Sequence, residues 1–185
     1  MPLSWSNFFR QEFFQRNTNI IFLTEIKVRT NNILASIPVL SPEWSISLDI
    51  RRDQSIQFGV TICSVIQLRA DGTEENYYGN RTPFIGIKPE TKEFHIASAI
   101  NGEWNERRNV NGLSDEETHH IEIHQKYFKN GGGKYRYSVQ IDGEEVVYFI
   151  NTDARQFYNV NVYASNPYND PCPVYISNLK ITNFL

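Results

Sequence analysis

The segment "WSISLDI", residues 44–50, alternates strictly between apolar and polar side chains. This period of two is typical of a strand that buries one face, because successive side chains point to opposite sides of a sheet. Trp44, Ile46, Leu48 and Ile50 are therefore predicted to face a core. The rest of the chain can be interpreted outward from this strand.

Similar alternation recurs in short runs along the chain. These runs cover residues 56–62, 94–96, 121–123, 135–141, 160–162 and 174–181. In the last run the pattern shifts by one residue, which predicts a bulge at Ser177-Asn178. Dipeptides that tolerate positive φ lie between the runs, namely Asp71-Gly72, Asn101-Gly102, Asn111-Gly112 and Asp142-Gly143. Many short strands with such turns predict an all-β, antiparallel two-sheet sandwich of the jelly-roll kind. Its predicted core contains Trp44, Ile46, Leu48, Val139, Ile141, Val160 and Val162.

The length of 185 residues fits one domain, which we expect to span residues 20–185. An aromatic segment, residues 1–19, precedes it. Trp5, Phe9 and Phe13 are spaced by four, which fits one face of a short helix docked on the sandwich. An exposed aromatic stripe for a membrane or a partner, and an additional strand, remain open.

The formal net charge of −3 gives no electrostatic reason to bind nucleic acid. The chain has no apolar run long enough for a transmembrane helix, and residues 1–10 do not resemble a signal peptide. A cytoplasmic protein, a processed secreted protein and an excised domain all remain open. We expect Cys63 and Cys172 to be unpaired, because Cys63 lies within a strand run and Cys172 lies in a loop between two prolines.

Three long connections are rich in side chains suited to recognition. Counting strands places residues 69–82, 101–118 and 166–173 at one end of the sandwich. Aromatic faces offer apolar area to sugar C–H groups, and amides and Arg supply directed hydrogen bonds. Trp104 is the predicted anchor of a binding site on this rim. The predicted ligand-binding residues are Tyr77, Tyr78, Asn80, Arg81, Trp104, Asn105, Arg107, Asn166, Tyr168 and Asp170.

A family resemblance supports this interpretation. The segments "PEWSISLDI", "YGNRTPFIGI", "FHIASAINGEWN", "IEIHQ", "YRYSVQIDGEEV" and "NVNVYASNPY…VYISNLKI" cover most of the chain. Together they resemble laminin-G-like domains of the concanavalin A-like lectin/glucanase superfamily. The resemblance implies a jelly roll and a non-catalytic recognition module, often extracellular, that binds glycans or proteins. Some such domains hold calcium at the rim; the calcium motif cannot be placed residue by residue in this sequence, so calcium binding stays open.

A second, weaker resemblance is to galectins. The segment "WNERR", residues 104–108, is similar to the galectin signature in which a Trp stacks on galactose near a Glu and an Arg. The upstream segment "YGNRTP" lacks the His of the galectin pattern. Galactose specificity is therefore not implied.

Sequence patterns that would indicate catalysis are weaker than those that indicate binding. Glu122 has no second carboxylate at glucanase spacing, and Glu144 and Glu145 are neighbours that point to opposite faces. The segment "IHQKYFKNG" resembles fragments of alginate-lyase motifs, but in those enzymes the His and Tyr fragments are far apart in sequence and an Arg/Glu-rich strand accompanies them. Here the fragments are contiguous and that strand is absent, so we interpret the similarity as coincidence. His120 and His124 are about 13 Å apart along a strand, too far for one metal ion, and no local Ser/His/Asp motif is present.

We therefore expect a non-enzymatic module, without a cofactor, that binds a glycan or glycoprotein. A protein-binding or extracellular-matrix module is the first alternative, and a polysaccharide-active enzyme is the second. The ligand's identity and the oligomeric state stay open.

Overall fold

The structure is a computed structural model that describes residues 17–22, 24–53, 61–72, 76–112, 114, 117–130 and 132–184. Within these ranges the chain forms strands, turns and loops, and no helix. The strands are β1 Asn17–Phe22, β2 Ile26–Lys27, β3 Asn32–Leu40, β4 Trp44–Arg52, β5 Cys63–Ala70, β6 Phe84–Lys88, β7 Glu93–Ile100, β8 Glu103–Val110, β9 Thr118–Tyr127, β10 Tyr135–Ile141, β11 Glu144–Asn151, β12 Phe157–Ala164 and β13 Val174–Phe184. The described part of the chain contains no helix of the length and apolarity needed to cross a membrane.

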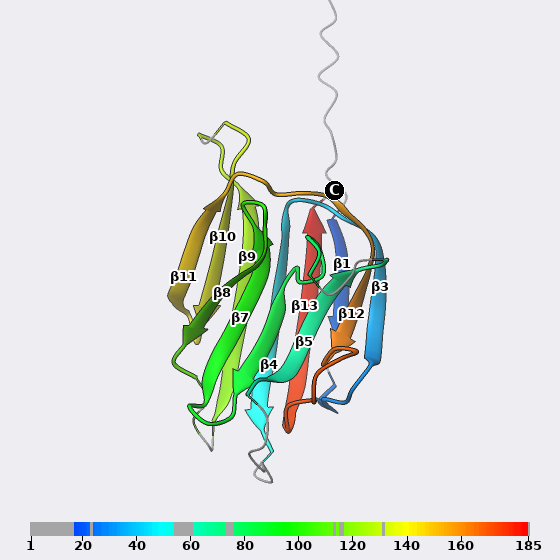
Figure 1. Ribbon diagram of the computed structural model, residues 1–185, viewed down its shortest axis with the longest axis vertical. Helices are drawn as coiled ribbons and strands as arrows, with labels where there is room; N and C mark the ends of the chain where they lie inside the picture. The colour runs from blue at the N-terminus through cyan, green and yellow to red at the C-terminus, as the bar shows by residue number, and fades with distance from the viewer. Residues whose placement is uncertain are drawn as a thin grey trace, which may run out of the picture.

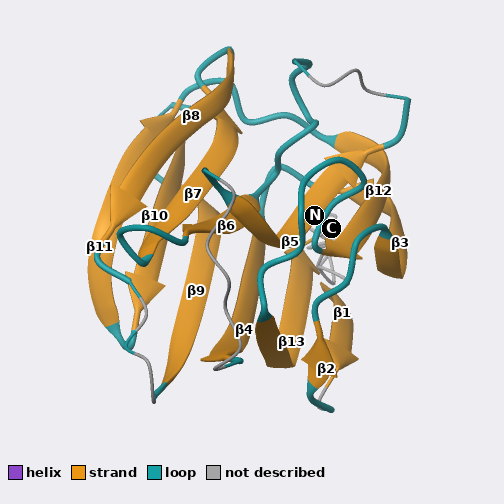
Figure 2. Ribbon diagram, turned by 60° about the horizontal axis from the view of Figure 1, so that its bottom comes forward, coloured by secondary structure: helices purple, strands orange, loops and turns teal. Residues whose placement is uncertain are grey.

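The strands form two antiparallel sheets. The seven-stranded sheet has the order β1-β13-β4-β9-β10-β11, with β2 beside β13, and the six-stranded sheet has the order β3-β12-β5-β6-β7-β8. Figure 1 shows the six-stranded sheet in front of the seven-stranded sheet, and Figure 2 shows the two layers from another side. The predicted all-β jelly-roll sandwich is therefore confirmed.

The core lies between the sheets and is centred on the pairing of β4 with β9. In this register Ile46 lies opposite Ile123, and Leu48 lies opposite Ile121. All seven predicted core residues are buried. Trp44 is 1% exposed, and its ring meets Tyr137 edge-on with the ring centroids 6.3 Å apart. The alternation in the sequence therefore identified the buried face correctly.

The predicted bulge in β13 is also present. The register of β13 against β4 shifts between Ser177 and Lys180, and Asn178 has a φ of 50°. Leu179 is consequently returned to the buried face at 1% exposure. A bulge inserts one residue and so restores the inward direction of the following side chains.

One strand was missed. The range 101–118 was expected to be a single loop, but it contains β8, which pairs with β7 after the turn at Asn101-Gly102. Because of this additional strand, every later connection lies at the other end of the sandwich from the end that the sequence predicted. The 165–173 loop therefore lies at the opposite end of the sandwich from the connection between β5 and β6, and the three connections do not share one rim. As an edge strand, β8 does not show the alternation that reveals a half-buried strand.

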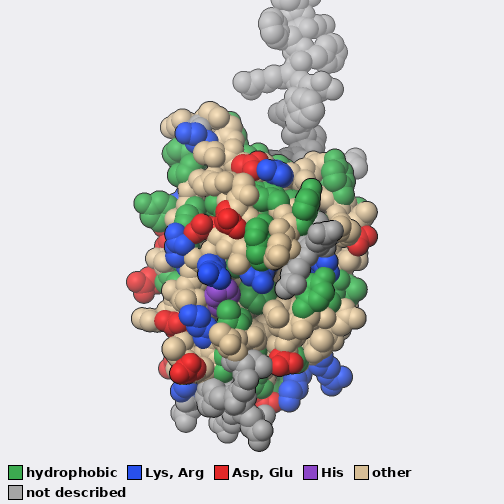
Figure 3. All heavy atoms as spheres, in the orientation of Figure 1, with side chains coloured by type: hydrophobic (Ala, Val, Ile, Leu, Met, Phe, Trp, Pro, Cys, Tyr) green, Lys and Arg blue, Asp and Glu red, His purple; other side chains and the backbone are tan. Residues whose placement is uncertain are grey.

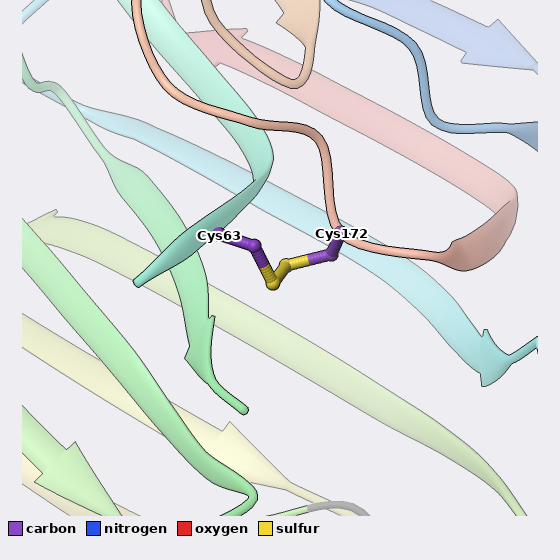
Figure 4. The surroundings of a disulfide bond; sticks show 2 residues. All are labelled: Cys63 and Cys172. Atoms are coloured by element: carbon purple, nitrogen blue, oxygen red, sulfur yellow. A yellow bond between two sulfur atoms is a disulfide. The ribbon is translucent and has the colours of Figure 1, made fainter. Parts of the chain in front are cut away.

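The expectation that Cys63 and Cys172 are unpaired is wrong, because they form a disulfide (Figure 4). The 165–173 loop runs beside the start of β5. The Ser64 N–H donates to the Asp170 carbonyl, and the Cys172 N–H donates to the Ser64 carbonyl. These bonds bring the two cysteine Cα atoms to 4.8 Å, within the distance that a disulfide spans.

Some sequence expectations fall outside the described residues. They are the aromatic segment before Asn17 and most of the predicted strand at residues 56–62.

The buried position of Trp44 leads to a stability prediction. Trp44→Ala should lower the free energy of unfolding by about 3–5 kcal/mol, because it removes a large buried ring and leaves a cavity. Trp44→Phe should cost less, since it keeps an aromatic ring against Tyr137. Urea unfolding of the three proteins measures both effects, and an unchanged midpoint for Trp44→Ala would refute the core assignment.

The disulfide leads to a second prediction. The double variant Cys63→Ala, Cys172→Ala should be less stable by about 2–5 kcal/mol, because the bridge limits the freedom of the unfolded chain. The chain has two cysteines, so dithiothreitol should destabilise the wild type and leave the double variant unchanged. Peptide mapping without reduction should recover the two cysteines linked, and finding them free would contradict the bridge.

Candidate functional site

The outer face of the six-stranded sheet carries two rows of residues in register, which are polar or charged except for Phe84, Ala97 and Gly86. One row across β5, β6, β7 and β8 consists of Gln67, Phe84, Ala97 and Arg107. The next row consists of Gly86, His95 and Asn109. The intervening side chains, such as Phe94 and Ile96, belong to the core. This face therefore presents the side chains that the core does not use.

A hollow of about 500 Å³ lies on this face. It is bounded on one side by β6 and β7 and on the other by the 165–173 loop. The lining residues are Thr61, Ile62, Arg81, Phe84, His95, Tyr168, Asn169 and Asp170. Figure 3 shows the same face, where several Lys and Arg side chains gather near one His side chain.

Arg81 is held between two aromatic rings. Its guanidinium carbon lies 5.0 Å from the centroid of the Phe84 ring and 5.1 Å from that of the Trp104 ring. Its Nη1 also donates a hydrogen bond to Oδ1 of Asn105. The rings and the amide fix the orientation of the guanidinium group, so a ligand would meet a preorganised cation.

A bulge in β8 makes this arrangement possible. In the pairing of β7 with β8, Ser98 lies opposite Glu106 and Ile100 lies opposite Glu103. Two residues of β8, Trp104 and Asn105, therefore oppose the single residue Ala99. In a regular strand these neighbours would point to opposite faces, but at the bulge both can contact the same side chain, that of Arg81.

His95 lies at the edge of the hollow as a neutral imidazole. Burial is the main cause that lowers its pKa below the ordinary 6.5; the hydrogen bond to Asn109 opposes this effect, and the charges of Arg81, Lys88 and Arg107 add to it. Its Nδ1 lies 2.8 Å from Oδ1 of Asn109. Because an amide oxygen only accepts hydrogen bonds, Nδ1 carries the proton and Nε2 keeps its lone pair.

The structure brings several of the predicted site residues together. Arg81, Trp104 and Asn105 are in direct contact. Tyr168 and Asp170 line the same hollow as Arg81. The Tyr168 ring is 52% exposed and stacks on the guanidinium group of Arg69, 5.0 Å from the ring centroid. These residues therefore meet on one sheet face, although their connections leave the sandwich at different ends.

Two predicted site residues are buried and act within the protein. Asn80 is 2% exposed, and its side-chain oxygen accepts a hydrogen bond from Gln67. Asn166 is equally buried, and its Oδ1 accepts the backbone N–H groups of Tyr168 and Asn169. Both residues position their loops and are not placed to contact a ligand.

The two adjacent tyrosines differ in their surroundings. The ring of Tyr78 packs against Phe157 and lies under the Arg155 guanidinium group, and its hydroxyl donates to the Asp153 carbonyl. Burial raises the pKa of Tyr78. Tyr77 is exposed. The structure does not place either of them in the hollow.

Sequence reasoning missed His95, Phe84, Arg69 and Asn109. A signal for His95 was present, because it is the polar residue between Phe94 and Ile96 in an alternating run and therefore faces outward. The other three become relevant only once the registers of β5 to β8 are known.

The outer face of the seven-stranded sheet carries a row of imidazoles and carboxylates. His120 Nδ1 lies 2.5 Å from Asp49, and His124 Nε2 lies 2.9 Å from Glu122. These groups pair with one another along β4 and β9. Among the described residues no group of three or more His, Cys, Asp or Glu side chains could hold a metal ion.

The chain matches no protein-family model, and no curated protein is significantly similar in sequence. Solved structures share its fold at low identity. The alginate lyase Aly36B, a mutant in complex with alginate tetrasaccharide, is 11% identical over 87% of this chain and 80% of that chain, with a TM-score of 0.56. The alginate lyase vAL-1 from Chlorella virus is 11% identical over 92% of this chain and 90% of the lyase chain, with a TM-score of 0.51. The galectin LEC-6 from Caenorhabditis elegans is 11% identical over 85% and 94%, with a TM-score of 0.48. The two lyase structures, with TM-scores above 0.5, show that the chain shares their fold, a two-sheet jelly-roll sandwich.

The neutral His95 leads to a prediction of pH dependence. Its folded-state pKa lies below the unfolded value near 6.5, so the unfolded chain takes up this proton first as the pH falls. The contribution of His95 to the free energy of unfolding is complete above pH 6.5. This contribution is lost as the pH falls from 6.5 toward the folded-state pKa. The stability of wild type should therefore fall more between pH 7.5 and 5.5 than that of His95→Gln. Urea unfolding of both proteins at pH 7.5 and 5.5 tests this prediction, because the other histidines are common to both. Equal losses of stability in the two proteins would contradict the lowered pKa of His95.

Proposed function

We propose that this domain binds an acidic oligosaccharide on the outer face of its six-stranded sheet without cleaving it. The observation that carries the proposal is the Arg81 guanidinium group, fixed between Phe84 and Trp104 at the hollow. A guanidinium group matches the geometry of a carboxylate and forms paired hydrogen bonds with it.

Aromatic and amide groups surround this cation. Trp104 is partly exposed and Tyr168 is more exposed, so each can offer a ring to the C–H groups of a sugar. Asn105 and Asn169 provide amides for hydroxyl groups. The combination of a stacking ring, an amide and a cation suits a sugar that carries a negative charge.

The charge of this face differs from that of the whole chain. The formal net charge is −3, whereas Arg81 lines the hollow. Arg69 lies over the Tyr168 ring of that lining, and the charges of Lys88 and Arg107 act on His95. Asp170 and Glu93 offset part of this charge. Cations concentrated on one face of an acidic protein favour an anionic ligand there.

The hollow favours an oligosaccharide over the alternative of a protein-binding or matrix module of the same fold, because a concave polar surface suits a small ligand better than a flat protein surface. The sequence resemblance to laminin-G-like domains agrees with non-catalytic recognition. The Cys63–Cys172 bridge supports an oxidising compartment, which fits an extracellular location.

Polysaccharide cleavage is the second candidate function. One specific observation favours it: His95, whose imidazole is neutral, and Tyr168 line the same hollow as Arg81. An arginine next to a base and an acid could support proton abstraction beside a carboxylate. Incubation with alginate, followed by absorbance of unsaturated products, separates this activity from binding alone.

The binding test uses calorimetric titration with alginate tetrasaccharide and with a neutral tetrasaccharide, each with calcium and with a chelator. The wild type should prefer the acidic ligand. Arg81→Ala should weaken binding by about 10- to 100-fold, because it removes a charged hydrogen bond worth about 1.5–3 kcal/mol.

Arg136→Ala is the matched control. Arg136 also lies over an aromatic ring, that of Tyr148, and bonds to Glu145, but it belongs to the seven-stranded sheet. Its loss should leave the affinity unchanged, and thermal melts should show that both variants fold. Equal affinity of Arg81→Ala and Arg136→Ala, or a preference for the neutral ligand, would overturn the proposal.

A further inference from the structure

The hairpin between β9 and β10 projects beyond the end of the sandwich. In the register of these strands Gln125 lies opposite Tyr137, and both are buried, at 3% and 1% exposure. The next pair on the same face joins Tyr127 to Tyr135, and Tyr127 is 45% exposed. The two strands therefore continue past the part that the opposite sheet covers, and Figure 1 shows the hairpin standing clear of the other connections at that end.

Aromatic rings are exposed together on this hairpin. Tyr127 meets Tyr135 edge-on, with the ring centroids 5.5 Å apart. The adjacent Phe128 is 45% exposed, and its backbone N–H donates a hydrogen bond to the Lys134 carbonyl. The hairpin thus holds its rings in place although no core covers them. Apolar rings that gather in water in this way indicate a surface that another partner covers.

The charge of the hairpin is positive. Lys126, Lys129 and Lys134 are exposed, and residues 126–136 include no Asp or Glu. Within the part of the chain that the structure describes, none of the three lysines enters an ion pair. Glu43, in the turn before β4, is the acidic group that acts on the base of the hairpin. The whole chain carries −3, so this projection differs in sign from the rest of the protein.

We propose that the hairpin between β9 and β10 docks this domain on a lipid bilayer with anionic headgroups. Tyr rings suit the headgroup level, and a Phe ring suits the boundary with the acyl chains. Lysine side chains bury their methylene stems at this level and leave their ammonium groups among the lipid phosphates. A projecting tip can reach that boundary while the sandwich stays in water.

The shape of the hairpin favours a bilayer over the acidic sugar proposed for the hollow. A glycan site is concave and surrounds its ligand with directed polar groups, as the hollow does around Arg81. The hairpin residues do not line that hollow. Their ammonium groups are flexible point charges beside exposed rings, which match a surface of many phosphates better than one oriented carboxylate.

A bilayer at the hairpin would leave the proposed glycan site free. Trp44, the first residue of β4, lies opposite Gln125 near the end of β9. Phe157, the first residue of β12, lies opposite Leu40 at the end of the preceding strand β3. Because β12 begins at the hairpin end, the 165–173 loop that follows β12 lies at the far end (Figure 1). The hollow beside that loop would face away from the lipid, so this inference does not depend on the proposed function.

The test is co-sedimentation of the full chain with vesicles of phosphatidylcholine, either alone or mixed with phosphatidylserine. The wild type should bind the mixed vesicles, and high salt should weaken the binding. The double variant Lys129→Gln, Lys134→Gln should bind about 20-fold more weakly, because each lysine near an anionic surface contributes about 1 kcal/mol, or about fivefold. Phe128→Ala should weaken binding about 10-fold, because it removes apolar area that the bilayer covers.

The matched controls carry the same changes elsewhere on the chain. The double variant Lys27→Gln, Lys180→Gln removes the same charge from exposed positions on β2 and β13. Tyr148→Ala removes a ring that is 64% exposed on β11. Both controls should bind like the wild type, and thermal melts should show that every variant folds. The aromatic segment before Asn17 is common to all these proteins, so a difference between them arises at the substituted residues.

A Phe128→Trp variant reports insertion of the tip. Its fluorescence should gain a component that brominated lipids quench, beyond that of the wild-type tryptophans. Equal binding to both kinds of vesicle, equal losses in the hairpin and control variants, or no added quenching would overturn the proposal. Displacement from the vesicles by alginate tetrasaccharide would also overturn it and assign the tip to a glycan.

Two cross-checks separate this proposal from the glycan proposal. Arg81→Ala should bind the mixed vesicles like the wild type, because Arg81 lies at the hollow. Phe128→Ala should keep the wild-type affinity for alginate tetrasaccharide. Loss of vesicle binding in Arg81→Ala would contradict docking through the hairpin, whereas loss of sugar binding alone in that variant would leave it standing.

Discussion

Each strand of this sandwich can bury only one of its two faces, because side chains alternate across a pleated backbone. The inner faces are occupied by apolar residues from both sheets, including Trp44, Leu48 and Val162. Chemistry is therefore confined to the outer faces, the edges and the turns. Arg81 and His95 lie on one outer face, and the row from Asp49 to His124 lies on the other.

The local alternation of apolar and polar residues was sufficient to predict the central strands, but it was not sufficient to predict the edge strand β8. The run from Trp44 to Ile50 has one face against a core, so its burial follows from alternation alone. The strand β8 has a free edge and a bulge, and its side chains contact a partner that is far away in sequence. Nothing within residues 103–110 distinguishes such a strand from a polar loop.

The candidate site shows the same limit. Trp104, Arg81 and Tyr168 could be nominated from residue type, and the structure places them on one face. The reason given for their proximity was incorrect, because the loops leave the sandwich at different ends. Their meeting depends on the registers of β5 to β8 and on the bulge opposite Ala99, which are long-range properties. The pairing of Cys63 with Cys172 depends on the path of the 165–173 loop in the same way.

That disulfide closes a covalent ring over a sequence separation of 109 residues. The ring includes the turn after β9, where Lys129 and Asn130 are exposed. A protease that cuts there would open the ring without releasing a fragment, because the two pieces remain joined through sulfur. The nicked molecule would keep both sheets and the 165–173 loop in place beside β5. The domain therefore has a built-in tolerance to cleavage that lasts as long as its surroundings are oxidising.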